Sequence, residues 1–100
     1  MKPFELILRP FPEEIRGIVR GVAEYDVKRG RFLIVIDEAL DDAERLFALK
    51  HELSHILLGH HDQTDRDLAI LEDEADRNAD QMTDAEFSRL MTYQIREAVV

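Results

Sequence analysis

A strongly periodic segment, residues 41–59, constrains the fold of this chain more than any other feature. Its apolar residues recur at helical spacing, so they form one stripe that must be buried against another layer. Asp41 is suited to cap the start of this helix, with Glu44 as its capping-box partner. Gly59 is suited to end it, because glycine readily adopts the left-handed conformation that follows many helices. The stripe consists of Leu46, Leu49, Leu53, Ile56 and Leu57.

The chain before this helix has the pattern of a small β-sheet. Phe4–Arg9 predicts a first strand, and Arg31–Asp37 predicts a stronger one with an uninterrupted apolar run. Residues 28–30 predict a hairpin turn in which Gly30 takes a positive φ. The alternation within residues 15–27 is imperfect, so this strand is less well defined. We expect the sheet to be antiparallel or mixed.

The chain after residue 59 reads as a loop followed by two more helices. Residues 60–65 are polar, and residues 66–81 form a second helical segment. Thr83 and Glu86 make a capping-box pattern that opens a third helix, which we expect to run to about Glu97. A sheet followed by helices is an α+β pattern.

Length and composition limit the class of protein. A chain of 100 residues suits one domain, residues 1–100, with a modest core. It has no Cys, so any metal site must use His, Asp or Glu. The net charge of −9 argues against nucleic acid or an anionic membrane as a partner. Its apolar runs are too short to span a bilayer, and no signal-peptide core follows Met1, so we expect a cytoplasmic protein.

The segment HELSH at residues 51–55 is the most informative motif. On a helix, His51 and His55 lie one turn apart on the same face, so two imidazoles can reach one zinc ion. Glu52 lies beside them, where it can hold the water that the metal activates. A catalytic zinc needs a third protein ligand and one open position. We therefore predict His51 and His55 as metal ligands and Glu52 as the catalytic base.

The third ligand is expected from the second helix. Glu72, Ala75, Asp76 and Ala79 share one helical face. The two Ala residues would let this helix approach the first one closely, so that Glu72 could reach the metal. Asp76, one turn later, could hydrogen-bond the far nitrogen of a ligand His.

Two other residues compete for the role of third ligand. Glu74 is also next to the small Ala75, but it lies roughly 200° around the helix from Glu72 and should be solvated. His61 follows His51 at the distance of a third His ligand in some zinc peptidases, but Leu58 stands where the turning Gly would be needed. We expect His60 and His61 to be loop residues at the end of the first helix.

Two motifs together resemble the ImmA/IrrE family of metallopeptidases. Residues 51–60 read HELSHILLGH and residues 72–76 read EDEAD, and the family pairs H-E-x-G-H with a later E-x-E-A-N. The resemblance covers roughly residues 15–82. Ser54 stands at the usual Gly of the first motif, and Asn78 stands where Phe usually follows the second.

The resemblance implies a gluzincin-like zincin fold whose metal is held by two His and a Glu. The family's ligand Glu is the first residue of its second motif, which corresponds to Glu72. Asp76 stands where the family often has Asn. The resemblance also implies a protein substrate, such as a repressor protein.

The sequence therefore predicts a zinc-dependent endopeptidase that cleaves peptide bonds with a metal-activated water and Glu52 as general base. The alternative is an inactive or latent zincin domain that binds metal or another protein, with residues 83–100 covering the cleft. We expect Arg31–Asp37 to bind substrate as an added strand. Candidates to stabilise the oxyanion are Tyr25, His60, Arg77 and Tyr93.

Overall fold

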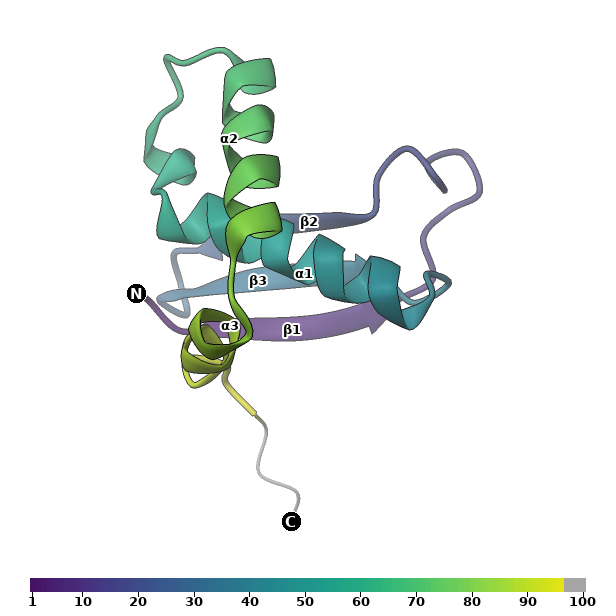
Figure 1. Cartoon of the computed structure of the whole chain (residues 1–100), viewed down its shortest axis with the longest axis horizontal. Coiled ribbons are helices and arrows are strands. Elements are labelled where there is room, and N and C mark those ends of the chain that lie inside the picture. The colour runs from purple at the N-terminus through teal and green to yellow at the C-terminus, as the bar shows by residue number, and fades with distance from the viewer. Residues whose placement is uncertain (97–100) are drawn as a thin grey trace.

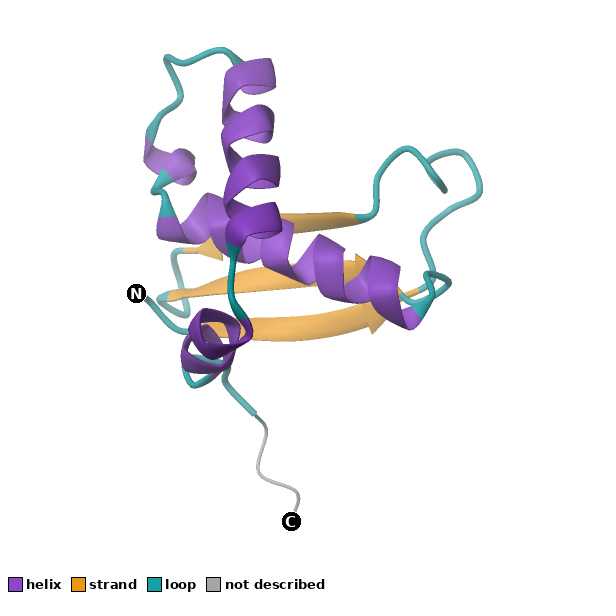
Figure 2. Cartoon of the chain, in the orientation of Figure 1, coloured by secondary structure: helices purple, strands orange, loops and turns teal. Residues whose placement is uncertain are grey.

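The computed structural model describes residues 1–96 and shows a three-stranded sheet followed by helices (Figure 2). This order confirms the α+β class that the sequence predicts. The strands are β1 (Phe4–Arg9), β2 (Gly21–Asp26) and β3 (Arg31–Asp37), and the helices are α1 (Asp42–Leu57), the short 3₁₀ helix η1 (His60–Asp62), α2 (Leu68–Gln81) and α3 (Asp84–Met91).

The sheet is mixed, with strand order β1-β3-β2. β1 runs parallel to β3, while β2 pairs with β3 as an antiparallel hairpin. The hairpin turn forms where it was predicted: Gly30 has a φ of 67° and donates its N–H to the carbonyl of Asp26 at 2.9 Å. Because β3 is central, both of its edges are hydrogen-bonded, and β1 and β2 form the two edges of the sheet.

Helix α1 lies along one face of the sheet, and α2 crosses it steeply (Figure 1). The Asp41 side chain accepts a hydrogen bond from the Glu44 N–H at 2.8 Å, as the capping pattern predicts. Leu49, Leu53 and Ile56 of the apolar stripe are buried against the sheet residues Phe4, Ile34 and Ile36, whereas the stripe residues Leu46 and Leu57 stay exposed. The core therefore fixes which face of α1 points away from the sheet.

The third helix is shorter than the sequence suggests. It ends at Met91 rather than near Glu97, and Glu97 itself lies outside the described residues. The chain then turns so that the carbonyl of Tyr93 accepts from the N–H of Phe4, and the N–H of Ile95 donates to the carbonyl of Phe4. The backbone groups of residues 93–95 thus pair with β1 instead of continuing the helix. In the part of the chain described, no helix is both long and apolar enough to cross a membrane.

Candidate metal centre

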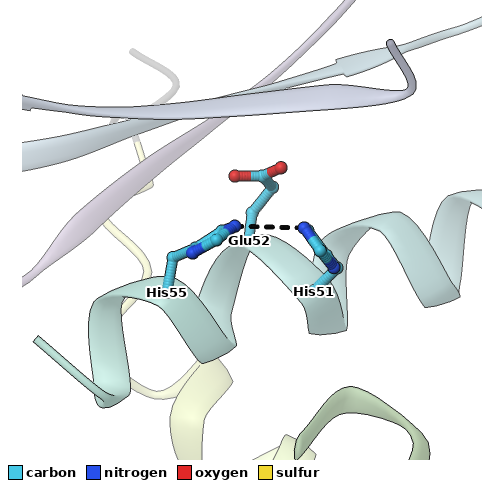
Figure 3. A group of neighbouring side chains, drawn as sticks. All are labelled: His51, Glu52 and His55. Carbon is cyan, nitrogen blue, oxygen red and sulfur yellow. Dashed lines mark hydrogen bonds between the residues drawn. The ribbon is translucent and has the colours of Figure 1, made fainter. Parts of the chain in front are cut away.

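Two imidazoles face each other across one turn of α1 (Figure 3). His51 and His55 are four residues apart, which puts them on the same side of the helix. Their Nε2 atoms lie 3.0 Å apart. Glu52 comes from the same turn and points toward the sheet, and ligand atoms of these three residues lie within 4.8 Å of one another.

Helix α2 brings a carboxylate to these imidazoles. Oε2 of Glu72 lies 2.9 Å from Nε2 of His51, and Oε1 of Glu72 lies 3.1 Å from Nε2 of His55. The two helices approach closely because the residues of α2 that face α1, Ala75 and Ala79, are small and buried. The close-packing face predicted from the two Ala residues is thus the face that carries Glu72.

Asp76 lies behind His51. Its Oδ1 is 2.7 Å from Nδ1 of His51. When Nε2 of His51 binds a metal, the proton of the neutral imidazole is on Nδ1, where it can be donated to Asp76. Nε2 of His51 faces Nε2 of His55 and the carboxylate of Glu72. Two imidazole nitrogens and a carboxylate form a usual donor set of catalytic zinc, so these residues fit a zinc ion.

The two competing residues lie elsewhere. His61 approaches the carbonyl of Ala23 with its Nε2 at 3.0 Å and packs beside Phe32. Glu74 faces away from the imidazole pair, as the helical geometry predicted. The expectation that Glu74 is solvated holds only in part, because its side chain is 38% exposed but its Oε1 is buried beside Nη2 of Arg66 at 2.6 Å.

Burial changes the titration of both groups on the inner side of α1. Glu52 is only 7% exposed, and this burial raises its pKa from 4.5 to about 7. The neighbouring His51 opposes this shift and Glu72 adds to it. Burial also lowers the pKa of His55 below 6.5, which favours the neutral imidazole that a metal requires. A general base works best with a pKa near the working pH, so Glu52 is suited to this role.

A cavity of about 630 Å³ opens above the imidazole pair and Glu52. One wall is residues 18–23, which lead into and form the start of β2. The opposite wall comes from α2, through Leu68, Leu71 and Glu72. The sequence pattern predicts the first wall only weakly, because the apolar residues of segment 15–27 alternate imperfectly.

The expectation that Arg31–Asp37 binds an added strand is wrong. β3 is paired on both sides, so its backbone groups are already used. The free edge at the cavity is β2. β2 pairs with β3 in antiparallel fashion, and just before β2 the carbonyl of Arg20 accepts from the N–H of Asp37. Along β2, every second residue therefore directs its backbone N–H and carbonyl toward β3, and the residues between direct theirs to the open edge. The carbonyl of Ala23 points to the open edge, where it faces the ring of His61.

The C-terminal segment does not cover the cavity in the region that the structure describes. α3 packs on the core through Leu90, beside Phe4 of β1. The cavity is not lined by Tyr25, Arg77 or Tyr93, three of the four candidates to stabilise an oxyanion. His60 does line it, but its ring contacts His55.

Gly21, the first residue of β2, allows this strand to pack closely against Glu52 of α1. A Cβ at this position would meet Cδ1 of Ile36 at 2.7 Å, the carbonyl of Val35 at 3.3 Å and Cγ of Glu52 at 3.4 Å. Gly21→Ala is therefore expected to lower the free energy of unfolding by about 1–3 kcal/mol, the usual cost of overpacking. Urea denaturation measures this. Gly30→Asn is the control, since nothing lies within 4 Å of a Cβ at Gly30 and Asn tolerates positive φ. Equal stability of Gly21→Ala and the unaltered protein would contradict the close packing.

The small mixed sheet, the helix carrying H-E-x-x-H and the acidic helix packed across it define a zincin-like domain with a group positioned for metal binding. The sequence profile of the IrrE N-terminal-like domain, a family of peptidases, matches residues 13–98. The chain belongs to this family, which confirms the resemblance seen in its two motifs. No curated protein and no solved structure matched the chain.

Proposed function

We propose that this protein is a zinc-dependent endopeptidase in which His51, His55 and Glu72 hold the metal. The observation that carries the proposal is the convergence of two Nε2 atoms and one carboxylate, 2.9–3.1 Å apart, beside the buried Glu52. A metal site with a purely structural role gains nothing from Glu52, whose burial as a carboxylate costs stability. The catalytic reading explains why it is there.

The chemistry follows from the positions of these side chains. When bound, the zinc ion acts as a Lewis acid that makes water more acidic and polarises a carbonyl. Glu52 takes the proton of the water that attacks the peptide carbonyl, because its carboxylate lies beside the two imidazoles that would hold the metal. It then returns this proton to the amine that leaves. Asp76 keeps the proton of His51 on Nδ1, so that Nε2 stays available to the metal.

The cavity favours an extended peptide as substrate. The backbone of Gly21 and the N–H of Ala23, on the open edge of β2, can pair with an added strand that passes over Glu52, whereas the carbonyl of Ala23 already faces His61. Ile18 and Leu68 are 80% and 69% exposed and stand at opposite walls, where they can receive apolar side chains. A segment of a protein fits this groove, and a repressor protein is the first candidate to offer as substrate.

Metal content and cleavage test the proposal together. Protein purified without chelator should contain about one zinc per chain by elemental analysis. It should cleave unfolded casein or an apolar peptide library, lose this activity on chelation and regain it with zinc. His51→Ala should lose the metal. Unchanged metal content in His51→Ala would refute the ligand assignment, and a zinc-loaded protein that cleaves none of these substrates would speak against the peptidase.

A further inference from the structure

His60 is a buried histidine that the proposed reaction does not use. Gly59, with a φ of 68°, turns the chain back after α1 and starts η1. This turn places His60, only 6% exposed, against the C-terminal part of α1. Its Nδ1 lies 2.9 Å from Nδ1 of His55. The contact is thus on the side of His55 opposite to the nitrogen that faces His51 and Glu72.

The far side of the His60 ring faces an ion pair. Nε2 of His60 lies 3.5 Å from Oε1 of Glu74, and the same oxygen lies 2.6 Å from Nη2 of Arg66. Neither contact has hydrogen-bond geometry, so this buried oxygen of Glu74 has no hydrogen-bond partner among the described residues. The His60 ring is thus placed with Nε2 beside a buried carboxylate oxygen and Nδ1 toward His55. When Nε2 of His55 binds a metal, the proton of this imidazole is on Nδ1, so Nδ1 of His60 is placed to accept it.

We infer that His60, buried after the turn at Gly59 and in contact with His55, is a positioning residue that fixes the tautomer and the ring of His55. The inference rests on the proposed function, because it concerns how one ligand of the same metal site is prepared. With its proton on Nδ1, His55 directs the lone pair of Nε2 at the site. Asp76 does the same for His51 from the exposed side of α2. The two ligand imidazoles are thus supported independently, one by a carboxylate and one by a neutral ring.

The test compares variants that differ in one acceptor atom. His60→Leu removes the acceptor and should weaken zinc binding about 10–100-fold, the usual effect of losing a group behind a ligand. His60→Asn puts an amide oxygen near the position of Nδ1 and should restore most of the affinity. His61→Leu is the matched control and should bind zinc normally, since His61 faces Ala23. Competition with a chromophoric chelator measures affinity, and circular dichroism verifies folding.

Two further measurements separate positioning from packing. Glu74→Gln should weaken zinc binding by up to about 10-fold alone and have no added effect in His60→Leu, because both act through one chain of contacts. The visible spectrum of the Co²⁺-loaded protein should change in His60→Leu and return in His60→Asn. Normal zinc affinity in folded His60→Leu, or equal loss in His60→Leu and His60→Asn, would overturn the inference alone. Absence of zinc binding by the unaltered protein would overturn it together with the proposed function, whereas zinc binding without cleavage would remove only the peptidase.

Discussion

Glu52→Gln is expected to lower the rate of peptide cleavage by about 10²–10⁴-fold, the usual contribution of a general base. Gln keeps the shape of the side chain but cannot take a proton from water. Zinc content should stay the same, because Glu52 is assigned to proton transfer while His51, His55 and Glu72 hold the metal. Steady-state kinetics on the same substrate and elemental analysis of both proteins measure the two effects. If the variant loses its zinc, Glu52 is a ligand and the proposed mechanism is wrong.

The stability of the same variant gives an independent check on the state of Glu52. Its pKa is raised in the folded protein from 4.5 to about 7, so the folded state binds the proton more tightly than the unfolded chain. Stability of the metal-free protein should therefore fall as pH rises from about 4.5 to 7. Gln avoids this cost, so metal-free Glu52→Gln should be more stable by about 3 kcal/mol above pH 7 and nearly equal below pH 4.5. A pH-independent difference would mean that Glu52 is solvated.

Glu72→Ala is expected to weaken zinc binding by more than about 100-fold, beyond the 10–100-fold typical of groups behind the ligands. Its carboxylate is the only group of α2 that lies within 3.1 Å of both imidazoles among the described residues. In a zinc-loaded structure, one of its oxygens should lie about 2.0–2.2 Å from the metal.

Glu74→Ala is the matched control for Glu72→Ala, on the same helix with the same loss of charge. Its effect should not exceed about 10-fold, because it acts only through His60. Chelator competition on the two variants ranks them. The reverse ranking would show that Glu74 turns toward the metal, and a zinc bond to His61 would assign the protein to a different class of zinc peptidase.

The active-site helix could be predicted because independent signals agree on it. The capping pair Asp41 and Glu44, the apolar period and Gly59 all mark the same segment. The same period sets His51 and His55 on one face. The position of Glu72 followed from the two Ala residues beside it, since small residues mark the closest approach of two helices.

The wall of the cavity and the contact to His60 could not be predicted in the same way. Both depend on tertiary pairing: the edge of the sheet is set by the order of strands, and His60 is placed by the turn at Gly59. Ser54 and Asn78 show the same limit. Each departs from the family pattern when read alone, yet in the fold the Asn78 side chain donates to Oγ of Ser54 at 2.9 Å between α1 and α2.

The pairing of Phe4 with residues 93–95 bears on the resistance of this domain to aggregation through the edge of its sheet. β1 is an edge strand, and an open edge is a template on which another chain can add a strand and start an aggregate. The bridge from Phe4 to Gln94 closes the beginning of that edge with the domain's own backbone. This pairing joins residues about ninety positions apart, so it can form only after the rest of this domain has been synthesised. Until then the edge of β1 is open, and the charged side chains of Glu5 and Arg9 disfavour the addition of another strand there.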